Sequence, residues 1–391
     1  MNKDIITLLS SVLGSDRILD APNFHACISY AQIHGLVGIV YYVLPMIPLD
    51  MQPDSKIRDF LKKAAYSSAV RNEIQDREIQ EIRKAFCSKA ILFLPVKGFE
   101  LKTLYPKPEM RYMSDTDILI EDLQADEVRL SLENLGYRTD RFGNGDTDIY
   151  TSPSGLRYEV HRSLEHEGFN ATSCLFLKDI LSYAVQDNAE DAMLRIPHEE
   201  HYAYILCHFV KHLLSGGIGV RQVMDIYLCR KKWTFDEEKL AKLLAELELT
   251  EFTATIEKLA NHWFGDGEGD SVTEELGDYI LGSGVFGKEE QKVADRMLKE
   301  EKKQSKLSYV WSRLFPSYKT MCFYYPVLKK WSILLPAFWV WRMIYALIFR
   351  RDKLKREVTT VSETDREAVR QRAAFYRRCG LNVYSEYVSK K

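Results

Sequence analysis

Two aspartates one residue apart stand at the start of a short apolar run in this chain of 391 residues. Asp115 and Asp117 lead into Ile118-Leu119-Ile120, a pattern that predicts a buried β-strand. Because side chains alternate between the two faces of a strand, both carboxylates point the same way. Carboxylate oxygens are ligands that Mg²⁺ prefers. The pair therefore predicts a metal site on one face of a sheet.

A lysine and a glycine before the aspartates could hold phosphate. Lys97 precedes a predicted helix over Gly98–Tyr105, and helix N-termini bind phosphates. Gly98 would let the backbone approach a phosphate, Lys97 would add a point charge, and Arg111 could grip a phosphate with two hydrogen bonds. Ser114 belongs to the same candidate phosphate site. An ordinary helix start and a surface arginine are the plain alternatives, but with the aspartates these residues indicate metal-dependent transfer from a nucleoside triphosphate.

A third carboxylate lies in a predicted hairpin. The strands at Thr147–Ser152 and Leu156–Ser163 flank a turn with proline, serine and glycine. Glu159 and His161 share one face of the second strand. Glu159 could complete a metal shell or accept a proton from an attacking hydroxyl. The alternative is a solvated glutamate and a surface histidine on an edge strand.

A second aspartate pair has the same spacing but a different context. Asp146 and Asp148 follow Gly143-Asn144-Gly145. Glycine, asparagine and aspartate are the residues that tight turns favour, because they tolerate positive φ or bond to their own backbone. We therefore interpret this pair as part of a turn and not as a metal site.

The order of these residues resembles a bacterial family of nucleotidyltransferases within the polymerase-β-like superfamily. The resemblance covers roughly residues 20–235. Its residues are Lys97-Gly98, Leu101, Tyr105, Pro108, Arg111, Ser114-Asp115-x-Asp117-Ile118-Leu119, Glu159-x-His161, His208-x-x-Lys211-His212 and Gly219-x-Arg221-x-x-x-Asp225-Ile226.

In that superfamily two strand aspartates and a third carboxylate hold Mg²⁺ for nucleotidyl transfer. The resemblance therefore implies catalytic and metal-binding roles for Asp115, Asp117 and Glu159, with Mg²⁺ or Mn²⁺ as the cofactor. The superfamily usually carries Gly-Ser ahead of the aspartates, where this chain has Lys97-Gly98.

Four further residues are candidates for the walls of the same cleft: His161, His208, His212 and Arg221. His208 and His212 fall on one helical face. Zinc would need more ligands than they supply, so we expect packing or substrate contacts. Arg221 is four residues from Asp225 and could form a local ion pair on a helix, or it could line the cleft.

The chain around these residues divides into three parts by pattern. Residues 1–88 have apolar positions at helical spacing, residues 89–173 mix strand and helix patterns, and residues 174–391 are helical again. The expected fold is α+β: a small mixed-sheet nucleotidyltransferase core flanked by helical segments.

The composition restricts the partners. The formal net charge of −2 argues against a nucleic-acid partner, since such surfaces show basic excess. Seven cysteines without a CxxC pair indicate reduced thiols, as in the cytoplasm. The N-terminal sequence lacks the pattern of a secretory signal peptide.

One apolar segment near the C-terminus raises the question of a membrane. Residues 332–349 are almost entirely apolar, interrupted by Pro336 and Arg342, and basic residues follow as far as Arg356. The interruptions disfavour a membrane span. We expect a buried or docking helix, with peripheral contact at the inner face of the membrane through 332–356 as the alternative.

Together these observations predict an enzyme that moves a nucleoside monophosphate from a nucleoside triphosphate to an acceptor hydroxyl. The acceptor stays open among sugars, other small molecules, peptides and protein side chains. One alternative is a non-catalytic protein of the same fold that binds a nucleotide or a partner. Another is a membrane-associated accessory factor in surface-polymer or peptide-product assembly, acting through 332–356.

Overall fold

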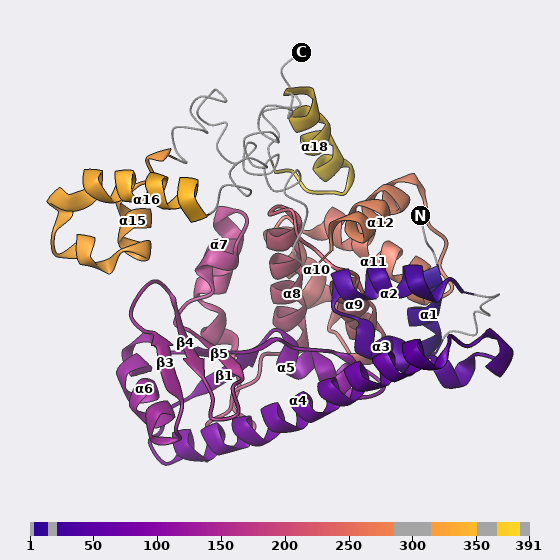
Figure 1. Ribbon diagram of the computed structural model, residues 1–391, viewed down its shortest axis with the longest axis horizontal. Helices are drawn as coiled ribbons and strands as arrows, with labels where there is room; N and C mark the ends of the chain where they lie inside the picture. Colours follow the sequence, from indigo (N-terminus) through magenta and orange to yellow (C-terminus); the bar gives the residue numbers. More distant parts are fainter. Residues whose placement is uncertain (1–3, 15–21, 285–313, 350–365, 384–391) are drawn as a thin grey trace. The chain divides into compact units, whose positions relative to one another are not determined.

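The computed structural model describes residues 4–14, 22–284, 314–349 and 366–383 (Figure 1). The chain divides into two compact units. The larger unit comprises residues 1–212 and 218–286, and the smaller comprises 213–217 and 287–391. The three-part division inferred from sequence patterns stays a prediction.

The larger unit contains a five-stranded mixed sheet with the strand order β1-β2-β5-β4-β3. Strands β2 and β5 run parallel, and the other neighbouring pairs are antiparallel. This arrangement confirms the predicted α+β class. The sequence patterns missed β3, an edge strand without an apolar residue. The strands are β1 (Phe93–Val96), β2 (Asp115–Ile120), β3 (Arg138–Arg141), β4 (Thr147–Thr151) and β5 (Arg157–His161).

Two helices cover one face of this sheet, α4 (Ser55–Cys87) and α6 (Ala125–Asn134) (Figure 1). Asp54 caps the N-terminus of α4, where its side chain accepts a hydrogen bond from the Ile57 amide at 2.9 Å. Burial of each large apolar side chain in the shared core contributes about 1.5–3 kcal/mol. Because strand side chains alternate, the residues between these core positions point to the opposite face. The core includes Ile79, Ile82, Phe86, Ile118, Ile120, Val128, Leu132, Tyr158 and Val160.

Helices from both ends of the larger unit pack against each other. Helix α1 packs on α11, and His34 in α2 links two later segments. His34 Nδ1 accepts from the Val220 amide at 3.3 Å, and its Nε2 lies 3.3 Å from the Leu281 carbonyl oxygen. Burial lowers the pKa of His34, which favours the neutral ring that this pairing needs. The helices are α1 (Asp4–Val12), α2 (Phe24–His34), α3 (Val37–Tyr41), α7 (Ala171–Lys178), α8 (His198–Leu213), α9 (Val220–Lys232), α10 (Glu237–Glu246), α11 (Thr250–Phe264) and α12 (Ser271–Ser283).

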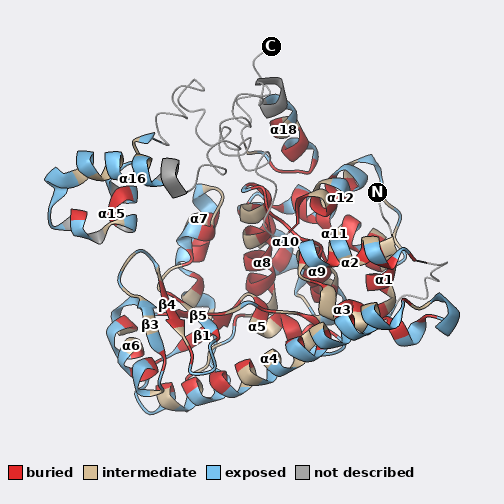
Figure 2. Ribbon diagram, in the orientation of Figure 1, coloured by how far each residue is buried: buried red, intermediate tan, exposed pale blue. Residues whose placement is uncertain are grey.

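The smaller unit contains α15 (Tyr318–Tyr324), α16 (Leu335–Phe349) and α18 (Arg366–Arg378). Much of α16 lies at the surface, as Figure 2 shows, and Trp341 is 57% exposed. Of the expected buried or docking helix, the buried alternative is therefore wrong for this side of α16, whereas Leu335, Phe338 and Trp339 on its other side pack on a small core that includes residues of α15. Of the helices that the structure describes, none combines the length and the apolar content that a bilayer crossing requires. The basic residues 350–356 lie outside the described part.

Candidate functional site

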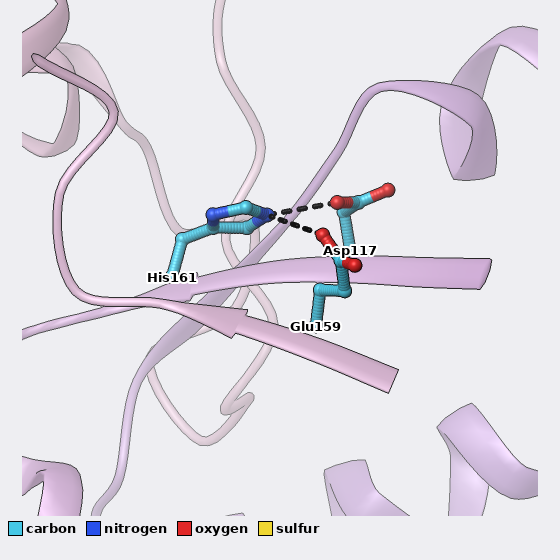
Figure 3. Close-up of side chains that lie close together, drawn as sticks. All are labelled: Asp117, Glu159 and His161. Atoms are coloured by element: carbon cyan, nitrogen blue, oxygen red, sulfur yellow. Dashed lines mark hydrogen bonds and ion pairs between the residues drawn. The ribbon is translucent and has the colours of Figure 1, made fainter. Parts of the chain in front are cut away.

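The face of the sheet turned away from α4 and α6 carries three polar side chains from two parallel strands. Pairing of β2 with β5 places Asp117 opposite Glu159, and His161 follows two residues later on the same face. One ligand atom from each residue lies within 4.8 Å of the others, and the three side chains point toward one another (Figure 3). Two carboxylates and an imidazole at this spacing are a donor set that fits a divalent cation.

The ammonium group of Lys97 contacts this cluster. Lys97 Nζ lies 2.6 Å from Asp117 Oδ1 and 3.4 Å from His161 Nε2. Lys97 stands between β1 and the short helix α5 (Gly98–Leu101), with a φ of +58°. A non-glycine residue at positive φ costs about 1–3 kcal/mol and persists where its surroundings hold it. The ion pair with Asp117 is one contact that holds this conformation.

The charges of the cluster shift the pKa of Asp117. Burial would raise this pKa, but the charge of Lys97 and the hydrogen bond with His161 outweigh burial and lower it to about 2. His161 Nε2 lies 2.8 Å from Asp117 Oδ1, and its other nitrogen lies 3.1 Å from Thr147 Oγ1. Asp117 is therefore ionised at neutral pH, as a metal ligand must be.

Asp115 lies at the start of β2, two residues before Asp117 and on the same face. Ser114 Oγ donates a hydrogen bond to Asp115 Oδ1 at 3.0 Å. Burial, followed by repulsion from Asp117 and Glu159, raises the pKa of Asp115. The charged form of Asp115 is thus disfavoured, which is the expected state of a carboxylate that a cation would neutralise.

The direction of this shift predicts a stability change. A folded pKa above the unfolded value means that folding loses stability as pH rises through the range between them. Asp115→Asn removes that loss, so we expect it to stabilise the protein at pH 7 by about 0.5–1 kcal/mol in buffer with a chelator. Thermal unfolding measures the gain, which should shrink as the pH approaches 4. The exposed Asp146→Asn is the control, and a lower melting temperature for Asp115→Asn would contradict the prediction.

Glu167 is a buried carboxylate that the sequence patterns did not single out. It ends a single turn after β5 and is only 1% exposed. Its oxygens lie 2.8 Å from His208 Nδ1, 3.4 Å from Lys97 Nζ and 3.6 Å from Lys211 Nζ. Burial would raise the pKa of Glu167, but these cationic partners outweigh it and lower the pKa well below the usual value. Glu167 therefore connects the sheet side of the site to α8.

A cavity of about 380 Å³ brings these groups together. Asp115, Asp117, Glu159 and His161 line it from the sheet, and α8 faces them across it. The α8 side presents His208, Lys211 and His212, which we call the α8 basic face. Positions three and four residues apart meet on one side of a helix. Burial, followed by the charges of His208 and Lys211, lowers the pKa of His212 to about 3, so this ring is neutral at pH 7.

The comparison with family models decides the family. The model described as "Uncharacterised nucleotidyltransferase" matches residues 20–265, more than half of the chain. The chain belongs to this family. The resemblance seen in the sequence is thereby confirmed, and the chain is a nucleotidyltransferase-family enzyme. No curated protein and no solved structure is similar enough to the chain to match it.

Arg111, which the sequence suggested as a phosphate ligand, lines the cavity but already holds a carboxylate. It is buried, and its Nε and Nη2 donate to the two carboxylate oxygens of Asp225 at 2.8 and 2.7 Å. Tyr105 donates to the same carboxylate at 2.8 Å. A Cβ on Gly98 would overlap Arg111 Nη1 and Met113 Sδ, so Gly98 serves close packing here.

The expected local ion pair between Arg221 and Asp225 is replaced by these contacts. Asp225 binds Arg111 and Tyr105, whereas Arg221 Nη1 donates to the Tyr112 carbonyl oxygen at 2.5 Å. Arg221 lines the cavity, and its Nε has no hydrogen-bond partner among the described residues. Both arginines line the cavity, and the Arg111 guanidinium is held by Asp225 through two hydrogen bonds, whereas Arg221 has no ion pair at hydrogen-bond distance among the described residues.

The second aspartate pair serves a turn, as predicted. Asp148 is buried, and its Oδ1 accepts a hydrogen bond from the Gly143 amide at 2.8 Å. Both Gly143 and Gly145 have positive φ. Asp146 is exposed at the turn. Identical spacing therefore has two different uses in one chain, and the flanking glycines distinguish them.

Proposed function

We propose that this chain transfers a nucleoside monophosphate from a nucleoside triphosphate to an acceptor hydroxyl and releases pyrophosphate. One observation carries the proposal. The cluster of Asp117, Glu159 and His161 and the α8 basic face line the same cavity. Nucleotidyl transfer needs a metal-binding group and a phosphate-binding group in one site.

Asp115, Asp117 and Glu159 are the proposed ligands for Mg²⁺ or Mn²⁺. Oxygen donors suit both ions, and the imidazole of His161 beside them favours the inclusion of Mn²⁺. A bound divalent ion would supply Lewis acidity toward the phosphates. Glu159 is also the proposed acceptor of the proton from the attacking hydroxyl. It receives a 2.7 Å hydrogen bond from Arg157 on one oxygen and keeps further acceptor positions.

The triphosphate would bind between the sheet and α8. Lys97 Nζ and Lys211 Nζ lie 3.4 and 3.6 Å from the same Glu167 oxygen, Oε1, so this region already accommodates an oxyanion. We propose that these ammonium groups, together with the guanidinium of Arg221, which lines the same cavity, bind the phosphates. Gly98 and Ser114 border the same space. Arg111 supports the site by holding Asp225.

Lys211→Ala tests the phosphate role, since this side chain is partly exposed and Glu167 keeps Lys97 and His208 as partners. Loss of a charge-assisted hydrogen bond costs about 1.5–3 kcal/mol, so we expect nucleotide affinity to fall about ten- to hundredfold. Calorimetric titration with each nucleoside triphosphate measures the change. The exposed Lys84→Ala is the matched control, and equal affinities for Lys211→Ala and the wild type would remove α8 from the proposal.

The transfer itself is tested with labelled nucleotides. The protein is incubated with each α-labelled nucleoside triphosphate, Mg²⁺ or Mn²⁺ and a cell extract, and labelled products are identified. We expect label from the α-phosphate in an acceptor and release of pyrophosphate. Transfer of a γ-label would indicate a phosphoryl transferase and would overturn the proposed reaction.

The second candidate is a protein of the same fold that binds nucleotide without turnover. It is favoured by the 2.6 Å contact between Lys97 and Asp117, because this ammonium neutralises a carboxylate that the transferase needs for metal. The two candidates differ in one result. A binder would take up nucleoside triphosphate in calorimetry but would leave every acceptor unlabelled.

A further inference from the structure

The smaller unit exposes an unusual concentration of large apolar side chains. Of the 24 exposed large hydrophobic residues in the described part of the chain, 11 lie between 314 and 345. A large apolar area exposed on a protein surface often marks an interaction site. We call five of these residues the α16 apolar face, two from the segment just before α16 and three from the helix itself: Trp331, Ile333, Val340, Trp341 and Ile344.

The α16 apolar face is separate from the side of the helix that packs internally. Leu335, Phe338 and Trp339 pack against a small core formed by Met321, Cys322 and Leu328. Trp339 Nε1 also donates to the Pro316 carbonyl oxygen at 3.1 Å. The exposed positions 340, 341, 344 and 345 recur at helical spacing on α16. The helix therefore has one side that packs on its own core and a second side on which Val340, Trp341 and Ile344 are exposed.

The positive charge of the segment 314–356 favours an anionic partner. Residues 314–349 contain Lys319, Lys329, Lys330 and Arg342 but no aspartate or glutamate. The sequence continues with five more basic residues and one acid as far as Arg356. The whole chain, in contrast, carries a net charge of −2. A cationic segment with an apolar face complements a surface that is both anionic and apolar beneath its charges.

The length of α16 and its residue types indicate whether the helix would cross a lipid bilayer or lie in its interface. The 15 residues of α16 extend about 22 Å, less than the roughly 30 Å of a hydrocarbon core. Tryptophan and tyrosine favour the boundary between lipid and water, since one end of each ring is apolar and the other polar. We propose that the α16 apolar face binds an anionic lipid surface, with the helix lying in the interface. The proposal is independent of the transfer reaction.

The full-length protein can be tested by sedimentation with vesicles. We expect it to bind vesicles of phosphatidylglycerol and phosphatidylcholine in equal amounts, to bind pure phosphatidylcholine vesicles far less, and to dissociate as salt is raised. Equal binding to both vesicle types would overturn the anionic specificity. Absence of binding to either would overturn the lipid surface itself.

A pair of matched double variants locates the contact. Ile333→Asp with Trp341→Asp should lower the vesicle partition coefficient at least about tenfold. Leu49→Asp with Leu123→Asp is the control, since these side chains in the larger unit are 82% and 97% exposed, and it should bind as the wild type does. Circular dichroism checks that each variant is folded. Equal binding of both variants to vesicles would contradict the assignment. Self-association of the wild-type protein that Ile333→Asp with Trp341→Asp abolishes would also contradict it, because the face would then bind a second copy of the chain.

Discussion

Replacement of Asp117 by asparagine should abolish nucleotidyl transfer, with a loss of at least about a thousandfold. A metal ion contributes several kcal/mol to such a reaction, and 1.36 kcal/mol corresponds to a tenfold change in rate. Asparagine keeps the size of the side chain and an oxygen for Lys97 and His161, but it removes the charge that binds metal. The labelled-nucleotide assay measures the loss. Adding Asp115→Asn should leave no measurable transfer.

Asp117→Asn should also change the stability of the protein, in the direction opposite to Asp115→Asn. Asp117 is the closest partner of the Lys97 ammonium, and Glu167 at 3.4 Å would then be the nearest carboxylate to it. We expect Asp117→Asn to destabilise the protein by about 1–3 kcal/mol, whereas Asp115→Asn should stabilise it. Asp146→Asn should change neither stability nor transfer. Loss of transfer in Asp146→Asn, with activity kept in Asp117→Asn, would place the active site elsewhere.

Removal of the Arg111 side chain should have the largest effect on stability. Arg111→Ala removes the guanidinium that pairs with the buried Asp225 carboxylate. The carboxylate then keeps only the hydrogen bond from the Tyr105 hydroxyl. Breaking a buried ion pair from one side costs about 3–5 kcal/mol because a charge stays buried without compensation. Chemical denaturation measures this loss. The Arg111 side chain is 8% exposed and that of Asp225 is 3% exposed, so little solvent is available to replace the lost partner.

This substitution also distinguishes a structural arginine from a phosphate-binding one. The double variant Arg111→Met with Asp225→Leu removes both charges, and it should recover much of the stability lost in Arg111→Ala. If Arg111 instead binds phosphate, Arg111→Ala would fold with normal stability and lose nucleotide affinity. That outcome would assign to Arg111 the role that we propose for Arg221.

Several parts of the site could be predicted from the sequence because they depend on local periodicity. Alternation along a strand places Asp115 and Asp117 on one face, and the same rule places Glu159 beside His161. The glycines around Asp148 predicted a turn, and the structure confirms it. The α+β class follows from the same patterns. These features depend on neighbours in the chain, whose effects a sequence displays directly.

The tertiary structure alone decided how these pieces meet. The pairing of Asp117 with Glu159 depends on the parallel register of β2 and β5, which distant packing sets. Arg111 lies 114 residues from Asp225, and Glu167 lies 41 residues from His208. A lone arginine or glutamate shows no periodic pattern in the sequence. Its partner depends on which polar groups the fold buries beside it, away from water. The types of chemistry were therefore visible in the sequence, whereas the choice between a ligand-binding and a supporting role required the folded chain.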